Sequence, residues 1–416
     1  MIHLNPAGLG RMPSAAQSVL AQWARHDDRY GDLELEERLE AGVRRTTHAH
    51  LAALLGAPAG GITLHRGAAE AFAAHVGRLP LGPGDRVWTT PYESAAHLTA
   101  LYALRDRTRC TLEVVPLRPD GDLDLEWMAR NIADDVALVS VTHVPAVCGI
   151  VNPVEDVGRI LAPHRCLYAV DASYAVGQLP VDAARIGCHL LTGDGWRFLG
   201  GPEAIGFAST APRMRDALTA PGARSLAPAA PAAPAVAALH AALAEHAATA
   251  GDVHGLTDAL RAAVEAAPGT EPVAPGRIQS GIVAFRHHDL PAADIRRQLA
   301  ERGIVVWKTV AQQTPLFQPP GTTATTTVRA SVRYDNTPED TARFGDALRE
   351  VLAAHRRRPR PPAGARPAPL AAVPGPAATR TPRTAARHRR PGAGHLTLVT
   401  TPTGRTPDPA VGGTPA

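Results

Sequence analysis

Residues 165–210 read RCLYAVDASYAVGQLPVDAARIGCHLLTGDGWRFLGGPEAIGFAST, and this stretch decides the fold. Its apolar runs LYAV, HLLTG and AIGFAS have the length of buried strands, and turns rich in glycine and proline separate them. Similar runs occur upstream, with helical patterns between them around residues 67–79, 94–106, 124–133 and 153–162. Strands that alternate with helices predict an α/β fold with a mostly parallel sheet covered on both faces.

In a sheet of this kind, ligands bind beyond the carboxyl ends of the strands. Polar or small residues at the predicted strand ends are therefore the candidates for a functional site. They are Gly67, Tyr92, His143, Asp171, Ser173, Thr192 and Asp194.

The composition changes several times along the 416 residues and suggests five segments. An N-terminal arm (1–20) precedes a large α/β domain (21–220), and an Ala/Pro-rich linker (221–236) follows. A small α+β domain (237–355) closes the fold. The remaining residues, 356–416, are rich in Pro, Arg and Ala, and we expect them to be disordered.

The net charge of +4 hides an asymmetry between the tail and the rest of the chain. The tail holds eleven arginines and one aspartate, about +10, which leaves about −6 on residues 1–355. A mildly acidic core does not indicate nucleic-acid binding. A basic tail can contact acidic surfaces or simply be solvated.

Other features of the composition exclude further classes of protein. The four cysteines are scattered without the spacing of metal ligands, so we predict no metal site. No apolar stretch is long enough to span a membrane, and the first residues lack the pattern of a secretory signal, so we expect a cytoplasmic protein.

Three segments carry a resemblance to a known family: LVSVTHVPAVCGIVNPVEDVGRI (138–160), YAVDASYAVGQLPVDAARIGCHLLTGDGWRFLGGPEAIGF (168–207) and VRASVRYDNTPEDTARFGDAL (328–348). They resemble the class V aminotransferases, which are pyridoxal-phosphate enzymes. The nearest branch is similar to the isopenicillin N epimerase-like and ergothioneine-pathway carbon–sulfur lyase-like proteins. The resemblance implies the fold-type I architecture, pyridoxal 5'-phosphate as cofactor, and a homodimer with its sites at the interface.

The resemblance assigns roles to four retained residues. Asp171 matches the aspartate that holds the proton of the cofactor ring nitrogen, although an aspartate here can also cap the following turn. Arg329 matches the arginine that binds a substrate carboxylate, with an ordinary salt bridge as the rival interpretation. Thr192 is placed as a hydroxyl near the cofactor phosphate. His143 is placed beside the cofactor ring, where it would stack or shuttle a proton.

The same comparison shows departures from the family pattern. Arg197 stands at the position of the Schiff-base lysine, and arginine cannot supply the neutral amine which that bond requires. Ala68 and Ala69 occupy the helix turn that should offer amides and a hydroxyl to the phosphate, with Glu70 beside them. The only lysine, Lys308, could approach the cofactor from another side or could lie in solvent.

Two functions of different class follow from these departures. The first is a catalytically degenerate homologue with a structural or regulatory role, either a homodimer or a heteromer with an active paralogue. The second is a pyridoxal-phosphate enzyme (transaminase, lyase or epimerase) acting on an amino-acid-like ligand without the usual internal aldimine. Arg197 would then act as an electrostatic clamp.

Overall fold

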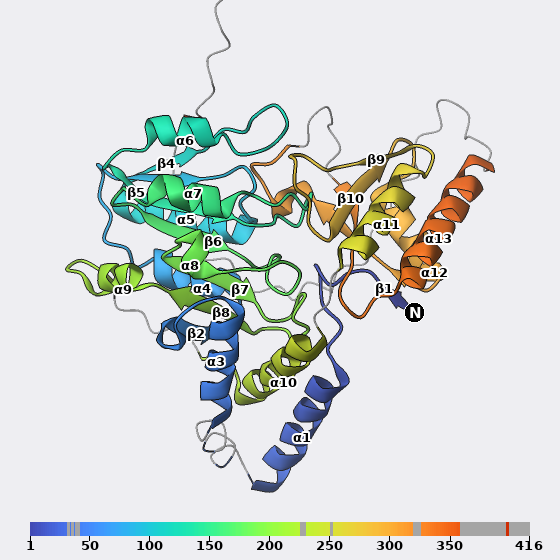
Figure 1. The fold of residues 1–416 in the computed structure, drawn as a ribbon, viewed down its shortest axis with the longest axis horizontal. Coiled ribbons are helices and arrows are strands. Elements are labelled where there is room, and N and C mark those ends of the chain that lie inside the picture. The colour runs from blue at the N-terminus through green and yellow to red at the C-terminus, as the bar shows by residue number, and fades with distance from the viewer. Residues whose placement is uncertain are drawn as a thin grey trace, which may run out of the picture.

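The computed structural model describes residues 1–30, 34, 37, 42–224, 230–249, 253–318, 326–357 and 397–398. Figure 1 shows a large unit built around an eight-stranded sheet and, beside it, a smaller unit built around a four-stranded sheet. Helices α1 (Ser14–Tyr30), α3 (Arg44–Leu54) and α10 (Ala233–Thr249) project from the lower end of the large unit in the same view.

The large sheet has the strand order β14-β4-β3-β5-β6-β7-β8-β2. All neighbouring strands pair in parallel except at β8, which runs antiparallel to both β7 and β2. The strands are β2 (Ile62–His65), β3 (Arg86–Thr89), β4 (Thr111–Val114), β5 (Val136–Thr142), β6 (Leu167–Asp171), β7 (Leu190–Asp194), β8 (Gly206–Thr210) and β14 (Thr397–Leu398).

Helices cover both faces of this sheet because its strands are apolar on both faces. In β6, Leu167 and Ala169 belong to one buried cluster, and Tyr168 and Val170 belong to the other, as the two-residue period of a strand requires. The first cluster includes residues of α4 (Ala68–Val76), α5 (Ala95–Thr108) and α9 (Pro212–Thr219). The second includes residues of α3 (Arg44–Leu54), α6 (Leu125–Asn131), α7 (Val154–Leu161) and α8 (Ala183–Ile186). The predicted α/β class and mostly parallel sheet are confirmed.

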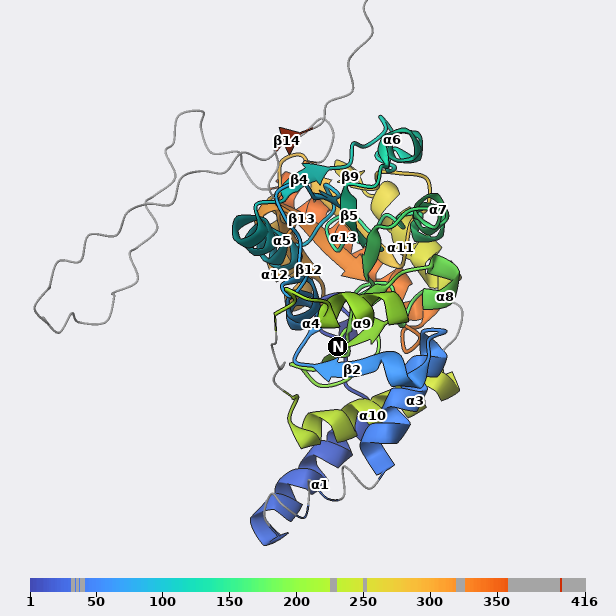
Figure 2. The same ribbon diagram turned by 90° about the vertical axis from the view of Figure 1, so that its left-hand side faces the viewer.

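The smaller sheet has the order β12-β13-β10-β9, and all of its pairs are antiparallel. It forms its own buried cluster with three helices, which Figure 2 shows from the side. These elements are β9 (Thr270–Pro272), β10 (Ile282–His287), β12 (Trp307–Val310), β13 (Thr326–Ser331), α11 (His254–Glu265), α12 (Ala292–Glu301) and α13 (Pro338–Arg357).

The predicted boundary at residue 237 differs from the structure. Helix α10 (Ala233–Thr249) packs on α1 (Ser14–Tyr30) and α3, and its Leu239 and Leu243 lie in the core of the large sheet. Its apolar face complements these two helices, so residues 237–249 pack with the large unit although the sequence assigns them to the small one.

The N-terminal arm crosses to the small unit. Strand β1 (Ile2–His3) pairs in parallel with β11 (Ile304–Val305), and Leu4 is completely buried in the small core. An arm expected to precede the large domain therefore completes the smaller one.

Most of the predicted disordered tail, residues 358–396 and 399–416, lies outside the described residues. Arg356 and Arg357 complete the last turn of α13. Thr397–Leu398 form β14, which pairs in parallel with β4. For these two residues the expectation of disorder is wrong. The edge of β4 offers unpaired backbone N–H and C=O groups, and an extended segment can form hydrogen bonds with them.

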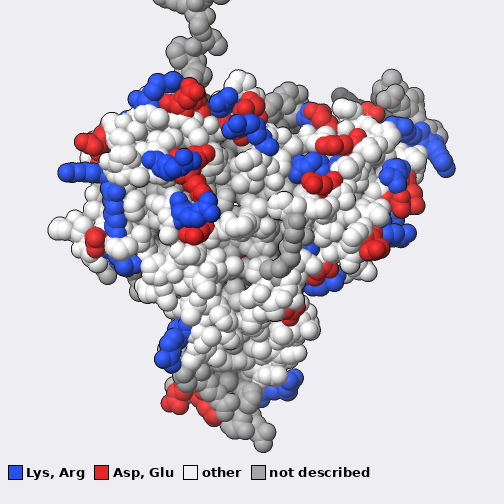
Figure 3. All heavy atoms as spheres, in the orientation of Figure 1, with Lys and Arg blue, Asp and Glu red and all other residues white. Residues whose placement is uncertain are grey.

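The surface and the cysteines complete the description. Figure 3 shows basic and acidic side chains interspersed over the upper parts of both units, whereas the lower projection carries fewer of them. All four cysteines are free and buried. Among the described helices, none combines the length and the apolar character needed to cross a membrane.

Candidate functional site

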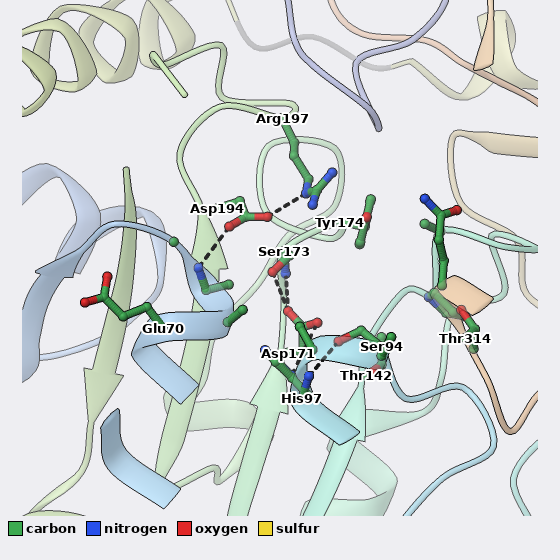
Figure 4. A pocket seen from close by; sticks show the side chains of 18 of the residues that line it. Glu70, Ser94, His97, Thr142, Asp171, Ser173, Tyr174, Asp194, Arg197 and Thr314 are labelled. Atoms are coloured by element: carbon green, nitrogen blue, oxygen red, sulfur yellow. Dashed lines mark hydrogen bonds and ion pairs between the residues drawn. The ribbon is translucent and has the colours of Figure 1, made fainter. Parts of the chain in front are cut away.

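A cavity of about 480 Å³ opens at the carboxyl ends of the central strands. Its walls come from the ends of β5, β6 and β7, from the turns before α4 and α5, and from a loop of the smaller unit at Gln313 and Thr314. Figure 4 shows the side chains that converge there. The lining residues include Gly67, Ala68, Ala69, Glu70, Tyr92, Ser94, His97, Thr142, Asp171, Ser173, Tyr174, Asp194, Trp196 and Arg197.

Asp171 ends β6 and lies in the cavity wall, as predicted. Its Oδ1 accepts hydrogen bonds from the backbone nitrogen of Ser173 at 2.9 Å and from the Ser173 hydroxyl. Its Oδ2 lies 3.7 Å from Nδ1 of His97. The aspartate thus caps the following turn through one oxygen while the other faces an imidazole, so both interpretations of Asp171 are compatible with its geometry.

His97 and Glu93 form a buried charged pair that the sequence analysis missed. Nδ1 of His97 lies 3.4 Å from Oε1 of Glu93, and the imidazole stacks on Phe72 with ring centroids 4.1 Å apart. Burial lowers the pKa of His97, but the charges of Asp171 and Glu93 outweigh it and raise the pKa to about 9. The imidazole is therefore protonated at neutral pH.

Glu93 is held by hydroxyl groups from the neighbouring strand. Ser140 and Thr142 donate to its carboxylate at 2.8 and 3.0 Å. Ligand atoms of Glu93, His97 and Asp171 lie within 4.8 Å of one another, which is close enough for a metal ion. In the structure His97 lies between the carboxylates of Glu93 and Asp171, so the three groups form an ion-pair chain. The i,i+4 spacing of Glu93 and His97 was the signal in the sequence.

Arg197 does not point an unpaired guanidinium into the cavity. Its Nε donates to Oδ2 of Asp194 at 2.7 Å, and its Nη1 donates to the carbonyls of Ala7 and Gly8 at 2.8 and 3.3 Å. The guanidinium also stacks over the ring of Tyr174, 4.0 Å from the centroid. Arg197 therefore joins strand β7 to the N-terminal arm, a contact between residues about 190 positions apart that sequence patterns could not indicate.

The turn before α4 lines the cavity, as predicted, but the first amide of the helix already donates to a carboxylate side chain of this protein. Ala68 donates its backbone N–H to Oδ1 of Asp194 at 2.9 Å. Glu70 accepts from the backbone nitrogen of Arg66 at 2.8 Å. Ala69 lies in the wall and offers no hydroxyl.

Two predicted residues lie away from the cavity. His143 is buried, does not belong to the cavity lining, and burial lowers its pKa to about 4. Thr192 is completely buried and does not line the cavity. It lies on the same face of β7 as Leu190 and Asp194, two residues before the end of the strand. Neither residue therefore lines this cavity, because strand-end position does not fix which side chain reaches it, and their roles beside the cofactor stay predictions.

Arg329 lies behind the cavity rather than in its lining. It is 3% exposed, and its Nη2 donates to Oδ1 of Asn5 at 3.3 Å. Burial lowers its pKa to about 10, Tyr174 opposes this shift, and Arg197 adds to it. Its Nε lacks a hydrogen-bond partner among the described residues. Because Arg329 is buried and forms no salt bridge within the described ranges, the rival interpretation of an ordinary surface salt bridge does not fit it.

Lys308 lies in β12 of the small sheet, opposite Val328, and is not part of the cavity lining. Among the residues that line the cavity, none is a lysine. Ser94 also lines the cavity and caps α5 by accepting from the backbone nitrogen of His97.

A model of the aminotransferase class-V family matches residues 17–344 of this fold. The chain belongs to that family. Curated relatives of this class V protein include a probable cysteine desulfurase of Halalkalibacterium halodurans, 30% identical over 134 residues that cover 32% of this chain and 33% of the relative. A probable cysteine desulfurase of Halobacterium salinarum is 35% identical over 126 residues, 30% of each chain. The matched part thus spans about a third of the length of these relatives.

Solved structures share the class V fold over most of the chain. The apo cysteine desulfurase from Thermococcus onnurineus superposes with a TM-score of 0.75 at 19% identity, over 85% of this chain and 95% of that one. The cystine C–S lyase C-DES, solved with its product cysteine persulfide, gives a TM-score of 0.73 at 18% identity, over 84% and 97%. A C-DES variant with a lysine replaced by alanine holds glycine covalently linked to its PLP cofactor.

The residues of this class V site do not fit pyridoxal phosphate held in the family manner. A covalent link needs a lysine, and the lining contains none. The phosphate would meet the Asp194 carboxylate at the amide of Ala68. Of the predicted cofactor contacts, Asp171, Ala68, Ala69 and Arg197 line the cavity, whereas His143 and Thr192 do not.

Proposed function

We propose that this class V aminotransferase-fold protein has lost the catalytic chemistry of its family and serves a structural or regulatory role. The observation that carries the proposal is the set of bonds made by Arg197, at the position where the family resemblance places the Schiff-base lysine. Its guanidinium binds Asp194, Ala7 and Gly8, so it is a structural connector. A charged guanidinium so engaged cannot act as a nucleophile.

Cofactor trapping tests this proposal. The purified chain is incubated with pyridoxal phosphate and reduced with borohydride, and any adduct is mapped by peptide mass. The variant Lys308→Arg is the control, because it removes the only lysine of the sequence. We expect no adduct at Lys308 and no turnover of amino acids. An adduct at Lys308 together with turnover that Asp171→Ala abolishes would overturn the proposal.

A second function is favoured by Arg329 and Asp171. Arg329 is buried, and its Nε has no hydrogen-bond partner among the described residues, which suits a ligand carboxylate, while Asp171 suits a ring nitrogen. The alternative is an enzyme acting on an amino-acid substrate that binds pyridoxal phosphate without a covalent link to a lysine. The lysine-to-alanine variant of C-DES, which still carries the cofactor, supports the principle.

The variant Arg197→Lys separates the two functions. If only this residue blocks the chemistry, the variant should gain a borohydride-trappable adduct at position 197. If the whole pocket has changed, as we propose, no adduct forms there.

We further propose that the chain is a cytoplasmic homodimer or pairs with an active paralogue. The support is the resemblance to a dimeric family. Sedimentation equilibrium of the purified chain distinguishes the homodimer from a monomer, and co-purification with a tagged paralogue tests the heteromer.

A further inference from the structure

The N-terminus of α4 has the properties of an anion site. The helix runs from Ala68 to Val76 and follows Gly67, so its first amides point toward the cavity. Free N–H groups and the helix dipole favour a negative group at such a position. In this chain the negative group is a side chain: Oδ1 of Asp194 accepts from Ala68 at 2.9 Å.

Asp194 is built into this position from both sides. Its second oxygen, Oδ2, accepts from Nε of Arg197 at 2.7 Å, and the residue is only 5% exposed. Burial raises the pKa of Asp194, whereas Arg197 and the amide of Ala68 oppose that shift. The bonded guanidinium and helix amide favour the ionised carboxylate.

We propose that Asp194 is a resident anion, which occupies the place of a ligand phosphate at the N-terminus of α4, so that this cavity selects ligands without a phosphate group. The inference deepens the proposed function and rests on it for the use of the cavity. Its observable, the preference between matched ligands, does not depend on whether the protein is catalytic.

Repulsion and packing both support this selection. A phosphate that approached the first turn of α4 would meet Asp194 and also Glu70, whose carboxylate bonds the backbone nitrogen of Arg66 on the same turn. Like charges repel strongly where water is excluded.

The turn before α4 is also closely packed. A Cβ added at Gly67 would lie 3.0 Å from the ring of Trp196, and one added at Gly206 would lie 2.6 Å from the backbone of Gly67. The turn therefore packs closely between Trp196 and strand β8, which leaves little space for a second anion beside Asp194.

The test compares pyridoxamine 5'-phosphate with pyridoxamine by titration calorimetry on the full chain. Both ligands carry an amine where pyridoxal phosphate carries its aldehyde, so neither can form a covalent bond with a lysine. The two ligands differ only in the phosphate group. We expect the wild-type protein to bind the phosphorylated form no more tightly than the other. A preference of about tenfold or more for the phosphorylated form, equal to about 1.4 kcal/mol, would overturn the inference.

Variants then show whether Asp194 is responsible. Asp194→Asn keeps an oxygen for the amide of Ala68 but removes the charge, and should gain at least about tenfold preference for the phosphorylated form. The single variant leaves the charge of Arg197 without its partner and can therefore unfold. In that case the double variant Asp194→Asn/Arg197→Gln, which removes both charges, is used instead. Asp182→Asn is the matched control, because Asp182 caps α8 through backbone amides away from the cavity.

The outcomes are distinguishable from those of the proposed function. If neither folded variant gains a phosphate preference, Asp194 is not the selecting residue and the inference fails. If the wild-type protein prefers phosphate yet shows no turnover, the inference fails while the proposed function stands. If the protein turns over amino acids and shows no preference for the phosphorylated ligand, the proposed function fails while the inference about Asp194 stands.

Discussion

Single residues decide whether this site is chemical or structural, and Arg197 is the clearest case. The guanidinium gives separate N–H groups to a carboxylate and to two carbonyls, in a planar arrangement that stacks on Tyr174. An ammonium group is a compact point charge on a flexible chain and cannot reproduce this fork. Arg197 thus connects strand β7 to the N-terminal arm.

Arg197→Lys should therefore destabilise the protein rather than repair it. Losing two or three hydrogen bonds of a charged group should reduce the free energy of unfolding by about 2–4 kcal/mol. Urea unfolding of the variant and the wild type measures this change. The control is Arg66→Lys, which also lines the cavity but is 62% exposed in its side chain, and should change little. Equal stability of Arg197→Lys and the wild type would contradict the structural role.

His97 should give the stability a pH dependence on the alkaline side. Its pKa in the folded state is about 9, above the ordinary value of 6.5, so its contribution is fully present below pH 6.5 and is lost as pH rises through 9. The full effect is on the order of 3 kcal/mol at 1.36 kcal/mol per pKa unit. Urea unfolding at pH 6 to 9.5 should show a decline that His97→Gln reduces.

His143 provides the contrasting variant. Burial lowers its pKa to about 4, so its contribution is present above pH 6.5 and is lost as pH falls toward 4. His143→Gln should change the acid limb of the stability profile and leave the alkaline limb unaltered. A change of the alkaline limb in this variant would contradict the assignment to His97.

At the scale of elements, the arm formed by residues 2–11 is tied to several distant groups. Its backbone carbonyls accept from Arg197, Arg333 and Asn336, and the nitrogen of Gly10 donates to the carbonyl of Trp196 at 2.8 Å. A Cβ at Gly10 would lie 1.8 Å from the carbonyl oxygen of Arg197. The close approach of two backbones requires glycine at this position.

Gly10→Ala should loosen the arm. The clash should cost about 1–3 kcal/mol, as other overpacking substitutions do, and it should make the first residues more accessible to proteases. Limited proteolysis and urea unfolding check both effects. Gly84→Ala is the control because a Cβ there meets nothing within 4 Å. Equal resistance of the two variants to proteolysis would show that the arm does not need this contact.

The elements themselves could be predicted because their signals are local. Alternating apolar runs and helix patterns predicted the strands that contain Asp171 and Asp194 and the helices between them, which confirms the fold class. The arm's bonds to Arg197 and the position of α10 could not be predicted, because they depend on contacts between distant residues. His143 and Thr192 do not line the cavity for a related reason: the direction of each side chain depends on the pleat and its neighbours, which the strand ends alone do not fix.

At the scale of the whole molecule, charge is divided between the tail and the rest of the chain. Residues 1–355 carry about −6 and residues 356–416 about +10, out of a total of +4. Attraction to a polyanion should therefore come from the tail alone.

A chain that ends at His355 should not be retained on a heparin column, whereas the full chain should be retained at low salt and released as the salt concentration rises. Comparing the two elution profiles checks this. Retention of the shortened chain would reveal a basic surface that the net charge hides.

The pairing of β1 with β11 has a consequence for biosynthesis. Residues 2–3 pair with residues 304–305, so during synthesis this segment waits for about 300 further residues before its partner strand exists. At 5–20 residues per second this delay lasts roughly 15–60 s. During that interval the buried cluster of the small unit, in which Leu4 packs, has not yet been completed. The small unit therefore cannot reach its final structure until residues 304–305 have been synthesised and have paired with residues 2–3.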